Sequence, residues 1–439
     1  MQQHTTIEKL YAHYLTSGQK ICTDTRKIEK DSLFFALKGD HFNANEFAAK
    51  AIEQGCSFAI IDEEKYHVLP QTILVENVLQ TLQQLANYHR KQLRIPFLAI
   101  TGSNGKTTTK ELVATVLSKK YDTLATFGNL NNHIGVPLTI LSITSQHQFA
   151  IIEMGANHQG EIDELCRIAE PDFGLITNIG KAHLEGFGGI EGVKKGKSEM
   201  YRFINSHRGR LFVNADDEVL MDLSSGIAKT TYSMHQNSDV LAKDITNSET
   251  VSFQFKNSND TTPWSNLENI HTHIIGHYNL VNCLAACCIG TYFEVPKQHI
   301  IDALANYHPN MNRSQLVKTK SNTVILDAYN ANPNSTRVAI DNFAKLTANH
   351  KVLCLGDMFE LGEYAEAEHQ AIVNLLIQKN FQHVILVGPN FQKTSGHSFT
   401  KLESTKQCIE LIKTMHLQNS HILIKGSRGM KMESLVEYL

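Results

Sequence analysis

The chain is organised around one stretch, Pro96-Phe97-Leu98-Ala99-Ile100-Thr101-Gly102-Ser103-Asn104-Gly105-Lys106-Thr107-Thr108-Thr109. Its apolar first half has the pattern of a buried strand, and its second half is a turn rich in glycine, lysine and threonine. The apolar residues between 112 and 117 then recur at helical spacing, so an amphipathic helix is expected to begin at Lys106-Thr107. Because the free N–H groups at a helix start attract anions, this order of elements predicts a phosphate-binding loop.

The loop departs from the usual sequence G-x-x-x-x-G-K-S/T, because isoleucine stands at the first glycine position. In the functional interpretation, Gly102 and Gly105 let the backbone approach nucleotide phosphates and Lys106 neutralises the outer ones. The hydroxyl of Thr107 or Thr108 then ligates Mg²⁺. The alternative is a structural turn with an exposed lysine. The order of strand, turn, lysine, hydroxyls and helix favours the nucleotide site.

Length and composition indicate a globular protein of several domains. At about 150 residues per domain, 439 residues suggest about three domains. Hydrophobic residues make up 42% and charged residues 19%, which excludes a largely disordered chain. The net charge of −3 (41 − 44) and the absence of a long Lys/Arg run give no support to a nucleic-acid or membrane-surface partner.

The chain starts without a basic segment followed by an apolar one, and no apolar run approaches the ~20 residues that span a bilayer. We therefore expect a cytoplasmic protein without membrane insertion. Its eight cysteines form no C-x-x-C pair and lie mostly in apolar surroundings. Buried free thiols are favoured over disulfides or a zinc site.

Alternating strand and helix patterns predict an α/β protein with three domains, residues 1–82, 83–307 and 308–439. The first is a small module with strands at 33–37, 58–61 and 73–75 and a helix at 45–54. The second contains the phosphate loop, strands at 149–154, 173–178 and 211–214, and a helix at 161–169. The polar segment 235–262 is expected to be a surface hairpin whose strand, 251–255, is half exposed. The third has strands at 324–327, 352–355, 384–387 and 422–424, each ending in a polar loop where a ligand can bind.

Three further side chains are candidates for chemistry. Glu153 ends a strand of the phosphate-loop sheet, where nucleotide-hydrolysing enzymes place an acidic metal ligand; a structural carboxylate is the alternative. His183 follows the next strand end and could ligate a second cation, contact a phosphate or do neither. Lys197 is one of three neighbouring lysines, and spacing alone cannot distinguish it from a solvated one.

In their order along the chain, these residues resemble the Mur ligases, the ATP-dependent amide ligases of peptidoglycan precursor synthesis. The resemblance rests on motifs that span nearly the whole chain: Thr101 to Thr108, Glu153-Met154-Gly155, Asn178 with His183, Lys197-Ser198-Glu199, Asn214 to Asp217, Gly276 with Asn279 and Asn282, Arg313, and Asp327. It implies a UDP-binding N-terminal domain, a central ATPase domain with a mostly parallel sheet and a Rossmann-like C-terminal domain.

Within the family, residues 327–333 and 355–362 are similar to those of the member that adds D-alanyl-D-alanine to UDP-N-acetylmuramoyl-tripeptide. The resemblance implies these two substrates, ATP, two Mg²⁺ ions, and a carbamylated lysine at Lys197. A monomer is expected. A close alternative is another ligase of the family, adding a single amino acid or polyglutamate. A nucleotide-binding regulator without turnover is a more distant one.

The resemblance also implies residue roles. Catalytic roles fall to Lys106, Lys197, Glu153 and His183, and metal contacts to Thr107, Glu153, His183 and Lys197. ATP contacts fall to Gly102, Ser103, Asn104, Gly105, Lys106, Thr107, Thr108, Asn279, Asn282, Arg313 and Asp327. Substrate contacts fall to Thr25, Arg26, Asn330, Asn332 and Asp357.

Two details qualify these assignments. The Asp24 and Arg26 turn alone would be an ordinary salt-bridged loop, but its resemblance to the family's UDP-holding segment favours binding. Tyr278 stands where the family usually has histidine, and Met311-Asn312 precede Arg313 where many members have Gly-Arg.

Overall fold

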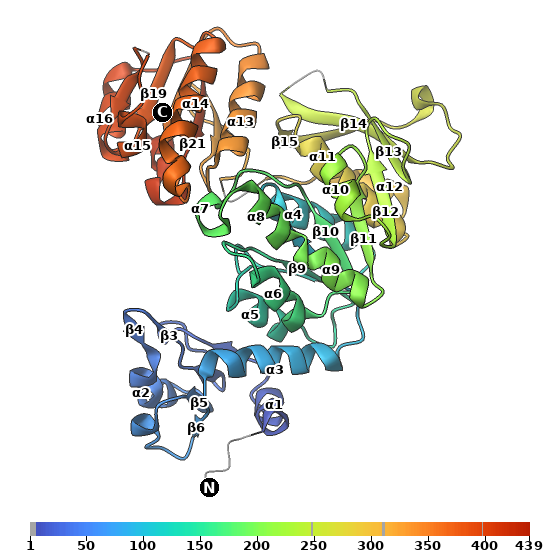
Figure 1. The fold of residues 1–439 in the computed structure, drawn as a ribbon, viewed down its shortest axis with the longest axis vertical. Helices are drawn as coiled ribbons and strands as arrows, with labels where there is room; N and C mark the ends of the chain where they lie inside the picture. Colours follow the sequence, from blue (N-terminus) through green and yellow to red (C-terminus); the bar gives the residue numbers. More distant parts are fainter. Residues whose placement is uncertain (1–5, 247–248, 310–311, 397) are drawn as a thin grey trace.

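The apolar run before the phosphate loop forms β7 (Phe97–Thr101), inside a nine-stranded sheet. The computed structural model describes residues 6–246, 249–309, 312–396 and 398–439, so Met311 and the first five residues lie outside the described part. The central sheet separates a small N-terminal unit from a C-terminal unit along the long axis of the molecule (Figure 1).

The strand order of the central sheet is β15-β14-β13-β12-β11-β10-β7-β9-β8, with parallel pairing from β8 to β13 and antiparallel pairing from β13 to β15. Besides β7, its strands are β8 (Thr123–Ala125), β9 (Phe149–Glu153), β10 (Phe173–Ile176), β11 (Arg210–Asn214), β12 (Lys229–Ser233), β13 (Val240–Asp244), β14 (Thr250–Asn257) and β15 (Ile270–Ile275). Its helices are α4 (Lys106–Leu117), α5 (Gly135–Leu141), α6 (Glu161–Ala169), α7 (Leu184–Phe187), α8 (Ile190–Lys197), α9 (Glu199–Ser206), α10 (Glu218–Leu223), α11 (Asn279–Tyr292) and α12 (Lys297–Ala305).

Helices cover both faces of this sheet because β7 alternates its side chains between two cores. Phe97 and Ala99 pack with α5, α6 and α9, whereas Leu98 and Ile100 pack with α4, α11 and α12. Both faces are therefore buried, which is why the parallel strands are continuous apolar runs rather than alternating ones. The predicted mostly parallel sheet is confirmed.

The expectation of a half-exposed strand at 251–255 is wrong. This part of β14 is buried throughout, and its polar side chains have found partners inside the protein. Ser252 Oγ lies 3.0 Å from His271 Nδ1, and the Gln254 amide donates to the Leu267 carbonyl and to Asn269. The alternating polarity of the sequence led to a wrong prediction because these hydrogen bonds offset the free-energy cost of burying the polar side chains.

The C-terminal unit is a six-stranded sheet in the order β16-β17-β21-β18-β19-β20, parallel except for β16. Its strands are β16 (Gln315–Lys318), β17 (Thr323–Asp327), β18 (Lys351–Gly356), β19 (His383–Val387), β20 (Thr400–Leu402) and β21 (His421–Lys425); its helices are α13 (Pro333–Lys345), α14 (Ala365–Gln378), α15 (Pro389–Gln392) and α16 (Thr405–Met415). The four predicted strands are present as β17, β18, β19 and β21.

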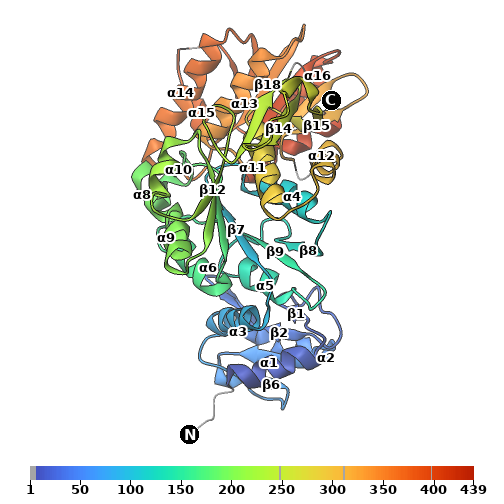
Figure 2. The same ribbon diagram turned by 90° about the vertical axis from the view of Figure 1, so that its right-hand side faces the viewer.

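The N-terminal unit is a four-stranded parallel sheet, β1-β2-β5-β6, with a two-stranded hairpin beside it. Its elements are α1 (Ile7–Thr16), β1 (Ile21–Cys22), β2 (Leu33–Phe35), β3 (Lys38–Gly39), β4 (Phe42–Asn43), α2 (Ala48–Glu53), β5 (Phe58–Ile61), β6 (Thr72–Leu74) and α3 (Val78–Gln92). Helix α3 lies between this unit and the central one (Figure 2). The domain limits at 82 and 307 stay a prediction.

The eight cysteines are buried and free, as expected from their apolar neighbours. Across the described ranges, no helix combines the length and the apolar character needed to cross a membrane.

Candidate active site

A cavity of about 720 Å³ lies between the phosphate loop and the polar strand ends of the C-terminal sheet. Among the predicted site residues, those that line it are Ser103, Asn104, Gly105, Lys106, Thr107, Thr108, Glu153, His183, Asn279, Asn282, Arg313, Asp327, Asn330 and Asn332. One cavity therefore brings the phosphate loop together with residues of the C-terminal unit that follow it by more than two hundred positions in the sequence. Gly102, Lys197, Asp357, Thr25 and Arg26 are not among its lining residues.

Two glycines let the phosphate loop turn tightly against its neighbours. Gly102 has a φ of +144°, and a Cβ there would lie 1.9 Å from Thr177 Oγ1. Gly105 has a φ of +80° at the N-cap of α4, close to Asn282. Lys106 Nζ folds back to donate to the Gly102 carbonyl at 2.7 Å. The loop thus presents a cation and free helix N–H groups to the cavity.

Glu153 is the hub of the oxygen-rich wall of the cavity. Its side chain is 1% exposed, and its Oε1 accepts from Thr107 Oγ1 at 3.1 Å and from Asn131 Nδ2 at 2.8 Å. Lys110 Nζ lies 3.7 Å from Glu153 Oε2. A hydroxyl and a carboxylate in contact are hard oxygen donors, so these residues fit Mg²⁺.

No three or more His, Cys, Asp or Glu side chains of the described residues gather as a metal site by themselves. A cation next to Glu153 would therefore need further oxygen ligands from water or from nucleotide phosphates. Magnesium is commonly bound in this way, through one or two carboxylates and substrate phosphates.

His183 extends from the loop after β10 toward the C-terminal unit. Its Nδ1 lies 2.5 Å from Glu360 Oε2, and this contact lowers the pKa of the Glu360 carboxyl. A second ion pair, Lys181 to Glu368 at 2.5 Å, joins the same two units. His183 thus takes part in a contact across the cavity, and its predicted metal and catalytic roles remain predictions.

Lys197 ends α8 in a fully buried position. Its Nζ lies 5.5 Å from the centre of the Phe187 ring and has no hydrogen-bond partner among the described residues. Burial, helped by the charge of Lys106, lowers the pKa of Lys197 well below its ordinary value. The structure thereby singles out Lys197 from its two lysine neighbours, which the sequence spacing could not do.

The predicted nucleotide contacts form a connected polar wall. Asn282 donates to Asn279 at 2.8 Å and accepts from Thr109 Oγ1 at 3.1 Å. The Arg313 guanidinium lies 3.7 Å from the centre of the Tyr329 ring, and its buried Nε has no hydrogen-bond partner among the described residues.

A second chain of hydrogen bonds continues this wall into the C-terminal sheet. Tyr278 Oη lies 2.6 Å from Ser314 Oγ, and the Ser314 N–H donates to Asp327. Asp327 in turn pairs with Lys425 at 2.5 Å. Tyr278 is therefore held in place by the segment that follows Arg313.

The residues predicted to contact the dipeptide differ in placement. Asn332 caps α13 and donates from Nδ2 to Asn104 Oδ1 at 2.7 Å, which ties it to the phosphate loop. Asn330 lines the cavity next to it. Asp357 is fully buried, and its carboxylate accepts from the backbone N–H groups of Asn390 and Phe391 at the start of α15. This geometry gives Asp357 a structural task and offers no support for dipeptide binding.

Thr25 and Arg26 belong to the N-terminal unit. Arg26 donates to both carboxylate oxygens of Asp24, at 2.9 and 2.8 Å, and these contacts lower the pKa of Asp24 to about 2. The Arg26 side chain is 86% exposed. It is therefore accessible to an anionic ligand, and its role in UDP binding stays a prediction.

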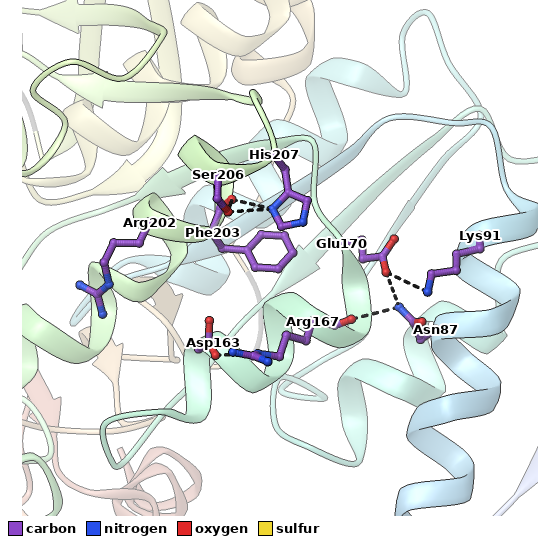
Figure 3. Close-up of a pocket in the computed structure, with 9 residues that line it drawn as sticks. All are labelled: Asn87, Lys91, Asp163, Arg167, Glu170, Arg202, Phe203, Ser206 and His207. Atoms are coloured by element: carbon purple, nitrogen blue, oxygen red, sulfur yellow. Dashed lines mark hydrogen bonds and ion pairs between the residues drawn. The ribbon is translucent and has the colours of Figure 1, made fainter.

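A second groove lies between α3, α6 and α9 (Figure 3). It is lined by Asn87, Lys91, Asp163, Arg167, Glu170, Arg202, Phe203, Ser206 and His207. Arg167 pairs with Asp163 at 2.7 Å and Lys91 with Glu170 at 3.3 Å, so its charges largely neutralise one another. It also contains none of the predicted site residues, and we do not assign the reaction to it.

Sequence reasoning missed three side chains of the main cavity and its surroundings: Asn131, Lys110 and Arg428. Asn131 and Lys110 hold Glu153, and Arg428 lines the cavity from the C-terminal unit. The asparagine-rich stretch Asn129-Leu130-Asn131-Asn132 is a signal in the sequence, but only the fold shows which strand end it contacts.

Comparison with known proteins adds an independent line. Residues 100–290 match the family described as Mur ligase middle domain, and residues 312–428 match Mur ligase, glutamate ligase domain. The UDP-N-acetylmuramoyl-tripeptide--D-alanyl-D-alanine ligase of Bacillus subtilis is 33% identical over 438 residues, covering 95% of this chain and 92% of that protein. The Escherichia coli ligase of the same name is 34% identical, covering 95% of this chain and 93% of that protein.

Solved structures of the same family are similar to this chain along nearly its whole length. The crystal structure of MurF from Acinetobacter baumannii matches with a TM-score of 0.83 at 31% identity, covering 95% of this chain and 92% of that one. MurF ligase from Thermotoga maritima in complex with ADP has a TM-score of 0.84 at 23% identity, covering 95% and 96% of the two chains, which supports the fold alone. Since relatives of this identity align along nearly all of the sequence, the chain belongs to the Mur ligase family.

Proposed function

We propose that this chain is an ATP-dependent ligase that adds D-alanyl-D-alanine to UDP-N-acetylmuramoyl-tripeptide during peptidoglycan precursor synthesis. The observation that carries the proposal is the single cavity shared by a phosphate loop and the polar strand ends of the C-terminal sheet. A ligase must bring a nucleotide, a carboxylate and an amine together, and the polar residues that line this cavity can contact all three. The identity of the amine acceptor rests on the names of the relatives.

In the proposed reaction, the tripeptide carboxylate attacks the γ-phosphate of ATP, which releases ADP and forms an acyl phosphate. The dipeptide amine then attacks the acyl carbon, an amide bond forms, and phosphate leaves with loss of a proton from the nitrogen. Lys106, beside the loop glycines, neutralises the transferring phosphoryl group. Such positioning and electrostatic stabilisation supply most of what phosphoryl transfer needs.

We propose that Thr107, Glu153, His183 and Lys197 hold two Mg²⁺ ions, which when bound neutralise the phosphate charge. An ammonium group cannot ligate a cation, so Lys197 would have to be modified. Its buried, unpartnered nitrogen with a lowered pKa supports a neutral amine. That amine can add to CO₂: a C–N bond forms, one C–O π bond breaks, and the nitrogen loses a proton, giving a carbamate.

The carbamate is tested with Lys197→Ala. We expect most activity to be lost, and acetate at high concentration to restore part of it by filling the vacated space. Wild-type protein in ¹³C-bicarbonate should show a carbamate carbon signal that the variant lacks. Lys195→Ala, an exposed neighbour, is the control and should behave as wild type. Full activity of Lys197→Ala in bicarbonate-free buffer would contradict the assignment.

We also propose that the enzyme acts as a monomer in the cytoplasm, where ATP and nucleotide-linked precursors are available. Eight buried free thiols are compatible with a reducing compartment.

The function is tested by measuring phosphate release while only the amine acceptor is varied. With ATP and UDP-N-acetylmuramoyl-tripeptide present, D-alanyl-D-alanine should stimulate release and yield the pentapeptide product, whereas D-alanine, L-lysine and glutamate should not. Faster release with one of the single amino acids would indicate another ligase of the family. Phosphate release that depends on neither the carboxylate substrate nor the amine substrate would indicate a nucleotide-binding regulator.

A further inference from the structure

Arg428 occupies a distinctive place in the active-site cavity. It begins a 3₁₀ turn, Arg428–Met430, directly after the loop that follows β21, and it lines the cavity together with Ser427 and Gly429. Its guanidinium carbon lies 4.8 Å from the centre of the Tyr329 ring. Within the described part of the chain, no carboxylate pairs with Arg428.

Three other positively charged side chains of the cavity contact protein groups or lie on the predicted nucleotide side. Lys106 donates to the phosphate loop, and Lys425 pairs with Asp327 and reaches the Asn330 carbonyl. Arg313 lies on the same tyrosine ring as Arg428 but belongs to the segment beside Ser314, on the predicted nucleotide side. Among the described residues, Arg428 is therefore a cation of the cavity that has no carboxylate partner and is remote in sequence from the nucleotide motifs.

The fold places Arg428 next to the predicted dipeptide site. Strands β17 and β21 are parallel neighbours with Asp327 opposite Lys425, so the loops that follow them leave the same sheet edge together. Ser427 Oγ lies 3.5 Å from the Ala331 carbonyl, which joins the two loops directly. Asn330 and Asn332 therefore share one wall of the cavity with Arg428.

The acceptor named in the proposed function carries a charge that needs a partner. D-Alanyl-D-alanine brings an amine to the acyl phosphate and a carboxylate at its other end. That carboxylate enters a cavity which already holds nucleotide phosphates, so it needs a cation of its own. A guanidinium suits this task because it can donate two parallel hydrogen bonds to one carboxylate.

We propose that Arg428 binds the C-terminal carboxylate of the incoming dipeptide, with Tyr329 keeping the guanidinium in position. This assignment rests on the proposed function. Arg428 would then determine specificity, because the guanidinium binds acceptors that end in a free carboxylate more tightly than acceptors that lack one. The amine would then point from the C-terminal unit toward the phosphate loop.

The experiment compares D-alanyl-D-alanine with D-alanyl-D-alaninamide, which lacks the charge, in wild type and Arg428→Gln. We expect Arg428→Gln to raise KM for the dipeptide about 10- to 100-fold, the range for losing a charged hydrogen bond, with KM for ATP and for the tripeptide precursor within about twofold. Wild type should prefer the acid over the amide by a similar factor in kcat/KM. In the variant that preference should fall to near one, and Arg428→Lys should restore part of it.

Arg337→Gln is the matched control, an exposed arginine on α13 that does not line the cavity. It should keep the wild-type preference for the acid. An acid-to-amide ratio unchanged by Arg428→Gln, or an equal rise in KM for ATP, would overturn the assignment while leaving the ligase function standing. Wild type that fails to ligate the dipeptide at all would overturn both.

Discussion

Replacing Lys197 by methionine should make the protein more stable while removing its activity. The structure buries the Lys197 amino group completely, without a hydrogen-bond partner among the described residues. In the unfolded chain the same amine is solvated and has a pKa of about 10.4. Folding therefore costs free energy at neutral pH, either to bury the charge or to remove the proton. Methionine fills a similar volume without that cost.

The pH dependence of the effect follows from the direction of the pKa shift. Burial lowers the pKa of Lys197 in the folded state, so the unfolded state binds more protons between the folded and unfolded pKa values. In that window, the free energy of unfolding of wild type rises by up to about 1.4 kcal/mol per pH unit from this group. Lys197→Met lacks this contribution. Its stability advantage should be largest below the folded pKa and should shrink, up to about pH 10.4, to the remaining cost of burying an unpaired neutral amine.

The assay is urea unfolding of wild type and Lys197→Met in CO₂-free buffers at several pH values, followed by circular dichroism and by the single tryptophan, Trp264. Trp264 lies in the central unit, between β14 and β15. Lys195→Met, at an exposed position, should change stability little at any pH. A Lys197→Met variant that is no more stable than wild type, or an advantage that does not shrink as pH rises, would refute the reasoning.

Three further predictions concern the proposed ligase reaction. Lys106→Ala should abolish phosphate release with the fold intact, because the lysine lies at the start of a helix and supplies charge rather than core packing; unchanged release would contradict its role. Arg26→Ala should raise KM for the nucleotide precursor and leave KM for ATP nearly unchanged, since Arg26 lies outside the reaction cavity; an equal rise for ATP would show that the N-terminal assignment is wrong. Gly102→Ala should remove activity and destabilise the central unit by about 1–3 kcal/mol, because its Cβ would lie 1.9 Å from Thr177 Oγ1; a variant with wild-type thermal stability and activity would show that the loop can relax.

The sequence predicted the strands best where both faces of a parallel sheet are buried. Such strands, β9 and β10 for example, are continuous apolar runs bounded by polar loops, and their positions follow directly from that pattern. The prediction for β14 is wrong because Ser252 and Gln254, which are buried, have the polarity of exposed positions. Their burial depends on His271 and Asn269, partners that only the folded sheet brings within reach.

The placement of the candidate site residues could be predicted for the same reason and only up to the same limit. Glu153 and the phosphate loop could be placed together because parallel strands end at one edge of a sheet. The motif alone could not show that Asp357 would be used to cap α15, since that depends on a helix start more than thirty residues later. Nor could it show that Lys197, rather than Lys194 or Lys195, is the buried lysine.

The contacts between the central and C-terminal units show why neither unit could carry out the proposed reaction alone. Asn332 donates to Asn104 of the phosphate loop, and Lys181 pairs with Glu368 across the same junction. Each of these contacts joins a strand-end loop of one sheet to the other unit. The cavity therefore exists only while the two units are together, and an acyl phosphate formed in it is shielded from water only for that time. Weakening the ion pair between Lys181 and Glu368 should therefore let phosphate release exceed amide formation, because water would compete with the amine for the acyl phosphate.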